Sequence, residues 1–145
     1  MQRRIFTLFT GCWIVAATLT SAAGQDFKQY PGSRLDDKAS GQASAVTKGL
    51  QCQVYTTTDG FDKMYAFYKA LYKEHEWPMQ APKLPSGQKV QWAFFILDGT
   101  KDLRQSKFWM KIQRPYIGTV NEGDGPDFKD IRDIGVIQTV RRIKE

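Results

Sequence analysis

The chain has 145 residues, of which 41% are hydrophobic, 13% aromatic and 25% charged. This length supports one compact domain, and the composition excludes a wholly disordered or collagen-like chain. Two cysteines are too few for a small disulfide-stapled domain or a four-cysteine metal site. The formal net charge of +6 at pH 7 permits an anionic partner but identifies no reaction.

Residues 1–24 have the composition of a secretory signal peptide. Arg3 and Arg4 precede an uncharged run at residues 5–20, which small residues follow. Basic, apolar and small-residue regions in this order predict cleavage after Ala23 or Gly24. The uncharged run is short for the ~20 residues of a membrane-spanning helix, so an uncleaved anchor is the less favoured alternative. We expect a periplasmic protein, with secretion as an alternative.

Residues 25–145 are predicted to form a single α+β domain with a polar N-terminal segment at 25–49. That segment is broken by Pro31-Gly32, a pair that suits a type II turn, and otherwise indicates a loop or a weak helix. From residue 50 to residue 55, apolar and polar residues alternate, which is typical of a half-buried strand. Cys52 would then be a buried thiol rather than a nucleophile.

An aromatic stripe predicts one long amphipathic helix after this strand. Apolar side chains recur with the period of an α-helix at Phe61, Met64, Tyr65, Tyr68, Leu71 and Tyr72. Asp59 is predicted to cap the start of this helix, and Trp77-Pro78 to end it near residues 74–76. A stripe with this spacing is typical of a helix face that packs on a core.

Further alternating segments predict the rest of the sheet. Residues 90–97 and 107–113 are expected to pair as antiparallel strands across Asp98-Gly99, and 134–140 to form another strand. The predicted fold is α+β, with one long amphipathic helix packed on a small antiparallel sheet in β-α-β-β-β order. We expect the helix to cover four residues of the central strands: Trp92, Phe94, Phe108 and Met110.

The opposite face of that sheet is the predicted binding surface. It would present Trp109 and Phe95, bordered by Lys107 and Lys111. Aromatic side chains with a cationic rim suit a sugar, an apolar ligand or an anionic partner. The alternative is that the N-terminal segment or a second copy of the chain covers this face, which would give a homodimer.

His75, between Glu74 and Glu76, is the candidate residue for a catalytic alternative. This alternative is a small periplasmic hydrolase that uses His75 with a nearby carboxylate, from Glu74, Glu76 or a loop. A surface histidine at a helix end is the favoured interpretation, because adjacent residues on a helix point apart. No catalytic residue, metal or cofactor is assigned, since no serine-hydrolase, phosphate-loop or zinc-protease motif occurs. The oxygen-rich loop at 121–127 leaves calcium binding open.

Several short motifs together resemble a group of small exported bacterial domains without a known activity. The motifs, which fall between about residues 28 and 113, are Tyr30-Pro31-Gly32-Ser33, Tyr55-Thr56-Thr57-Thr58-Asp59, Phe67-Tyr68-Lys69 and Trp77. The resemblance implies an α+β domain of the envelope and transfers no catalytic residue.

Together these features predict a non-catalytic binding or accessory module of the cell envelope. The expected partner is an envelope protein, an anionic polymer or a small ligand. Nucleic acid is not expected, because an exported protein seldom meets it and acidic residues are interspersed with the lysines. No stable membrane span is expected after cleavage.

Overall fold

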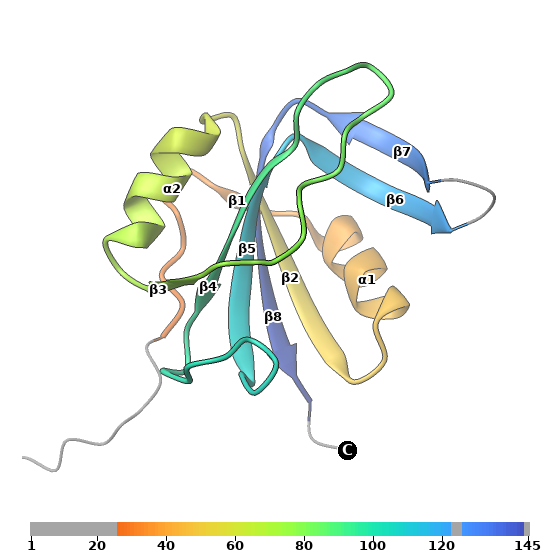
Figure 1. The fold of residues 1–145 in the computed structure, drawn as a ribbon. Helices are drawn as coiled ribbons and strands as arrows, with labels where there is room; N and C mark the ends of the chain where they lie inside the picture. The colour runs from red at the N-terminus through yellow and green to blue at the C-terminus, as the bar shows by residue number, and fades with distance from the viewer. Residues whose placement is uncertain (1–25, 123–125, 144–145) are drawn as a thin grey trace, which may run out of the picture.

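The structure is a computed structural model that describes residues 26–122 and 126–143. Within these residues the chain forms a six-stranded antiparallel sheet, two helices and a separate two-stranded hairpin (Figure 1). The predicted combination of helix and antiparallel sheet is confirmed. The predicted single long helix is wrong, because two short helices take its place.

The C-terminal strand lies inside the sheet rather than at its edge. The strand order is β1-β2-β8-β5-β4-β3, and every neighbouring pair is antiparallel. The six strands are β1 (Arg34–Leu35), β2 (Leu50–Thr57), β3 (Lys73–His75), β4 (Gln91–Ile96), β5 (Phe108–Arg114) and β8 (Gly135–Arg142). After Pro115 the chain leaves the sheet and forms a hairpin of β6 (Tyr116–Glu122) and β7 (Pro126–Arg132).

Helix α2 (Phe61–Lys69) covers one face of the sheet and forms the main core. Met64 and Tyr68 have no exposed surface and pack with sheet residues that include Phe95, Met110 and Ile137. Burial of aromatic and aliphatic side chains of this size contributes roughly 2–3 kcal/mol each. The predicted aromatic stripe therefore has the role expected of it.

The helix is shorter than predicted because its continuation pairs with the sheet. Lys73–His75 form β3, which adds to the edge of β4. This pairing satisfies backbone groups of β4 that a longer helix would leave without partners. Leu71 and Tyr72 still pack against the core, although the backbone there has already left the helix.

Residues 26–33 lie against α2 and the α2 side of the sheet. The Tyr30 hydroxyl donates a hydrogen bond of 2.8 Å to Asp59 Oδ2, and the Phe27 ring lies 5.2 Å from that of Tyr55. Asp59 was predicted to cap α2, but the N-cap is Gly60, which makes no side-chain bond. The Asp59 carboxylate instead holds the N-terminal segment in place.

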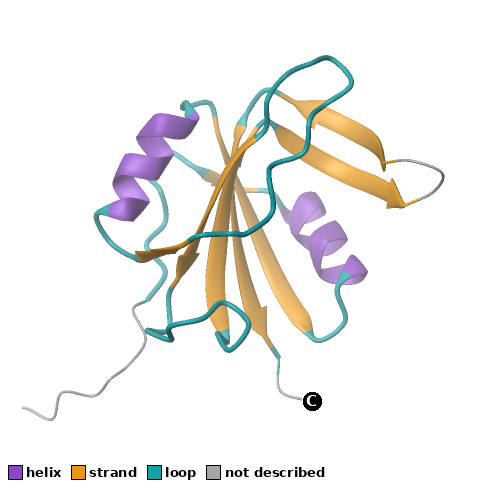
Figure 2. Cartoon of the chain, in the orientation of Figure 1, coloured by secondary structure: helices purple, strands orange, loops and turns teal. Residues whose placement is uncertain are grey.

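Helix α1 (Asp37–Val46) lies on the opposite side of the sheet from α2 (Figure 2). Asp36 caps it, with Oδ1 accepting a 2.9 Å bond from the Ala39 amide. Two serine hydroxyls of α1 accept hydrogen bonds from backbone amides of β2. Ser40 accepts from Val54 at 2.8 Å, and Ser44 accepts from Cys52 at 2.9 Å. Neither helix of the described chain has the length and hydrophobicity of a transmembrane segment.

Candidate binding site

The sheet face that α1 partly covers also carries Lys111, at the middle of β5. Lys111 lies directly opposite Phe94 of β4 and Gln138 of β8, and Gln113 lies opposite Trp92 one step further along. Directly paired residues of neighbouring strands project to the same side of a sheet. The α1 face therefore has a polar centre, formed by one lysine and two glutamines, beside an aromatic margin.

Helix α1 and the base of the β6–β7 hairpin form the walls over this polar centre. Tyr116 of the hairpin packs in a small apolar cluster with Ala39 of α1 and with Val54 and Val136 of the sheet. The Arg132 guanidinium lies 4.1 Å from the centre of the Tyr116 ring, and its Nη2 is 3.7 Å from Asp36 Oδ2. The hairpin is thus fixed to the N-terminus of α1.

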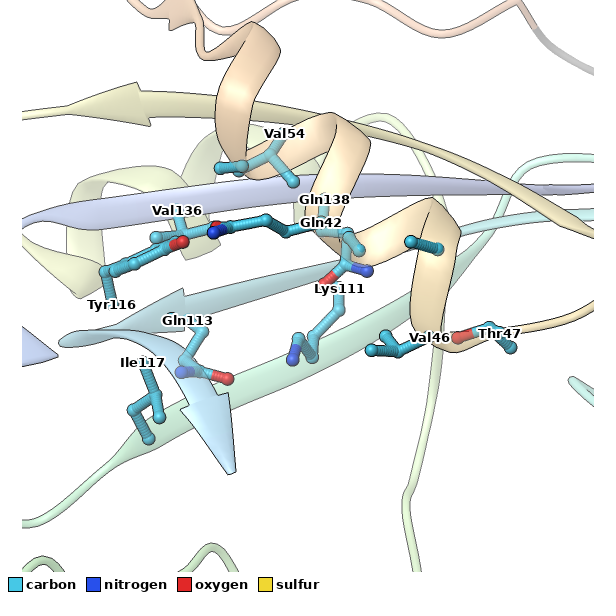
Figure 3. A pocket seen from close by; sticks show the side chains of 14 residues that line it. Gln42, Val46, Thr47, Val54, Lys111, Gln113, Tyr116, Ile117, Val136 and Gln138 are labelled. Atoms are coloured by element: carbon cyan, nitrogen blue, oxygen red, sulfur yellow. The ribbon is translucent and has the colours of Figure 1, made fainter. Parts of the chain in front are cut away.

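Between these walls lies a hollow of about 610 Å³ (Figure 3). Small-molecule sites in proteins are typically a few hundred to about 1,000 Å³. Val46, Val54 and Val136 supply aliphatic surface to the hollow. Its larger polar side chains are Gln42, Lys111, Gln113, Tyr116 and Gln138. The hollow can therefore accept a compact ligand that has both apolar and polar parts.

Lys111 is the one charged residue that lines this hollow in the described chain. It is only partly exposed, and no hydrogen bond or ion pair joins it to any described residue. Burial lowers the pKa of Lys111 from its ordinary value of 10.5, and the nearby Cys52 partly opposes this shift. Buried cations normally have an anionic partner. When protonated, Lys111 gives the hollow a positive charge that the described chain leaves uncompensated.

The structure separates the four residues of the predicted binding surface. Lys111 lines the hollow. Trp109 lies on the same face, near the start of β5, where the Arg142 guanidinium is 5.5 Å from its ring centre. Lys107 is exposed just before β5 and does not line the hollow. Phe95 is wrongly placed by the prediction, since it has no exposed surface and belongs to the core under α2.

The error at Phe95 arises because β4 is apolar on both faces. Alternation alone does not tell which set of side chains faces the helix, and Phe95 pairs with the buried Met110. The expectation that α2 covers Trp92 and Phe94 is also wrong, because both residues lie on the face that carries Lys111. The Phe94 ring instead stacks on that of Trp77 at 4.9 Å, and Trp92 packs edge-on to Phe94 at 5.7 Å.

Alternation in the sequence puts Gln113 on the same side of its strand as Lys111, but the predicted binding surface included neither Gln113 nor Gln138. Gln113 and Gln138 lie inside largely buried strands, and Gln113 is itself buried, donating a 2.9 Å bond from Nε2 to the Pro115 carbonyl. A glutamine in the middle of an apolar strand is a signal that could have been used. It would have indicated which face of β5 and β8 is not packed against the core.

Glu74, one of the carboxylates that the hydrolase alternative offers, does not lie beside His75. Glu74 Oε2 accepts bonds from the Tyr65 hydroxyl at 2.7 Å and from Lys69 at 2.9 Å, on the α2 side. His75 pairs with Phe94 in the sheet, and its ring centre is 6.5 Å from that of Trp77. Adjacent strand residues project to opposite faces, so Glu74 is directed away from His75.

The oxygen-rich segment 121–127 is the tip of the β6–β7 hairpin, and its residues 123–125 lie outside the described chain. Among the described residues, no three His, Cys, Asp or Glu side chains are grouped as a metal site requires. Calcium binding by residues 121–127 is untested by the described residues and stays a prediction from the sequence.

Replacing Asp36 with alanine is expected to lower the free energy of unfolding by about 1–2 kcal/mol. The change removes both the cap of α1 and the carboxylate beside Arg132. Urea denaturation measures the effect. The matched control is Asp37→Ala, an exposed first-turn residue, with an expected loss of about 0.5 kcal/mol or less. Equal losses in the two variants would contradict the role given to Asp36.

Comparison of the chain with protein-family models, with curated proteins and with solved structures found no match. The motif resemblance seen in the sequence is left as a prediction, and its residues lie away from the hollow. Tyr30, Phe67 and Tyr68 pack together on the α2 side, where the Tyr30 and Phe67 rings are 5.2 Å apart. These three aromatic residues of the motifs therefore belong to the main core. The hollow on the other face is the candidate site.

Proposed function

We propose that this protein is a non-catalytic binding module of the bacterial cell envelope, exported to the periplasm, and that the hollow beside Lys111 is its ligand site. The observation that carries the proposal is Lys111 itself. A partly buried cation without an anionic partner is unfavourable to the folded protein unless something else supplies the missing charge. A ligand with an anionic group supplies it.

The ligand class follows from the lining of the hollow. One lysine suits one carboxylate, and the glutamines beside it can donate or accept further hydrogen bonds. Val46, Val54 and Val136 favour a short apolar body. A small carboxylate with an aliphatic or alicyclic part fits both requirements, whereas a polyanion would find a single charge in the hollow to pair with.

Burial makes this pairing stronger than one at the protein surface. Charges that are partly removed from water interact through a lower effective dielectric. A bound carboxylate is therefore expected to stabilise the protonated form of Lys111. Because the ligand binds only the folded state, it should also raise the melting temperature of the protein. Because burial lowers the pKa of Lys111, affinity should begin to fall at a pH below 10.5 as the amine loses its proton.

Titration with octanoate tests this proposal. Isothermal titration calorimetry is expected to show saturable binding of octanoate and at least tenfold weaker binding of octanol, which has the same tail without the charge. Lys111→Met keeps most of the length of the side chain and removes the amine, so it should weaken octanoate binding at least tenfold. Lys107→Met is the matched control, since Lys107 is exposed and outside the hollow.

Two results would refute the proposal. One is an octanoate affinity that is the same in Lys111→Met and the unmodified protein. The other is a lack of binding across a series of carboxylates from acetate to decanoate. In either case the hollow would not be a site for an anionic ligand.

A further inference from the structure

One end of the sheet gathers basic side chains from segments that are far apart in the sequence. The Arg142 amide donates to the Lys107 carbonyl at 2.9 Å, and the Arg142 Nη2 donates to the Arg104 carbonyl at 3.4 Å. Figure 1 shows the β4–β5 loop beside the end of β8 at this end of the molecule. We call this surface the cationic end. It consists of the exposed residues Lys101, Arg104, Lys107, Arg141, Arg142 and Ile143.

The acidic residues nearby do not cancel this charge. The Asp98 carboxylate is already bonded within the β4–β5 loop. It accepts hydrogen bonds from the Lys107 and Phe108 amides and from the Thr100 and Ser106 hydroxyls. Asp102 accepts the Arg104 amide at 2.9 Å and makes a weak surface ion pair with the Arg104 side chain at 3.6 Å. Five basic residues against two acids leave a net positive surface.

This surface is also amphipathic. The Arg141 guanidinium lies 4.0 Å from the centre of the Phe108 ring, and that of Arg142 lies 5.5 Å from the Trp109 ring. Ile143, next in the chain, is 53% exposed. Basic residues beside aromatic and aliphatic side chains are typical of surfaces that bind at the boundary of a lipid bilayer. A soluble polyanion would bind through the basic side chains alone and would not need the exposed apolar ones.

The start of the described chain lies at the same end. The Asp26 carbonyl accepts a 2.8 Å bond from the Tyr72 hydroxyl, just before β3, and Lys73 of β3 pairs with Ile96 at the end of β4. In the sequence, the uncharged run of residues 5–20 ends a few residues before Asp26. The predicted export segment therefore precedes, in the sequence, a point of the domain that lies at its cationic end.

We infer that the cationic end docks on the anionic phospholipid headgroups of an envelope membrane, independently of any ligand in the hollow. Basic side chains provide the long-range attraction, and Ile143 and the arginine-capped aromatic rings contact the interfacial region. None of the six residues of the cationic end lines the hollow.

Co-sedimentation with lipid vesicles tests the inference on the protein recovered from expression of the full-length sequence. The vesicles contain either equal parts of phosphatidylglycerol and phosphatidylethanolamine or phosphatidylcholine alone. The test variant carries Lys101→Gln, Arg104→Gln and Lys107→Gln, which remove charge without touching the core. The matched control carries Lys38→Gln, Lys83→Gln and Lys89→Gln, which remove the same charge from exposed positions elsewhere.

We expect binding to the anionic vesicles that weakens as salt is added. The test variant should partition at least about tenfold less than the control, since each basic residue near an anionic surface raises partitioning several-fold. Equal partitioning of the two variants would overturn the inference. So would equal binding to phosphatidylcholine, or binding to the soluble polyanion heparin without binding to anionic vesicles.

Discussion

Replacing Phe95 with alanine is expected to lower the free energy of unfolding by about 3–5 kcal/mol, the largest effect foreseen for a single substitution in this chain. Phe95 has no exposed surface, and its ring centre is 6.2 Å from the rings of both Tyr65 and Tyr68 in α2. Alanine would leave a cavity between the helix and the sheet. Urea denaturation followed by circular dichroism measures the loss.

Two further variants keep this test informative if Phe95→Ala does not fold. Phe95→Leu retains most of the apolar volume and should remain folded with a smaller loss, of about 1–2 kcal/mol. Trp109→Ala, on the opposite face and partly exposed, should cost about 1–2 kcal/mol, although tryptophan is the larger residue. A loss of about 3–5 kcal/mol in Trp109→Ala would mean that the main core lies on the α1 face.

The periodicity of the sequence was sufficient to predict which residues of α2 are buried. Met64 and Tyr68 are four residues apart and both have no exposed surface, as a helical stripe requires. The same stripe could not show where the helix ends, because Leu71 and Tyr72 pack on the core from a non-helical backbone. Pairing of β3 with the edge of β4 decides that boundary, and strand pairing is not local in sequence.

The two faces of the sheet could not be assigned from alternation, for two physical reasons. β4 is apolar at every position from Trp92 to Ile96 and carries large side chains on both faces, so either face could be buried. The final strand, β8, also inserts between β2 and β5, which determines what lies beside each central residue. The sequence contains no local signal for that insertion.

The candidate site was predicted only at Lys111, because its walls come from distant segments. α1 contains Gly41, together with serines and alanines, and its stability depends on the Asp36 cap and on bonds from β2 amides to Ser40 and Ser44. The hairpin contributes Tyr116 through contact with α1. Neither contact can be inferred from composition, so the hollow appears only once the chain is folded.

Asp98→Asn is expected to lower the free energy of unfolding at pH 7 by about 2 kcal/mol. Partial burial opposes ionisation of Asp98, but hydrogen bonds from the Lys107 amide, from Thr100 and from Ser106 outweigh it and lower the pKa to about 2. The Lys107 amide is only 2.6 Å from Oδ2. In Asp98→Asn, an NH₂ group in the place of Oδ2 would face the Lys107 N–H, which is also a donor. The β4–β5 turn would therefore lose its central hydrogen-bond acceptor.

This loss should depend on pH in a defined direction. Folding lowers the pKa of Asp98 below its ordinary value of 3.8, so the ionised carboxylate stabilises the folded protein above pH 3.8, and that stability disappears as the pH falls towards 2. The difference between the unmodified protein and Asp98→Asn should therefore shrink between about pH 4 and pH 2. Asp62→Asn, at an exposed helical position, is the control, with an expected loss within about 0.5 kcal/mol at pH 7. A difference between the unmodified protein and Asp98→Asn that stays constant down to pH 2 would show that the Asp98 carboxylate does not hold the turn through its charge.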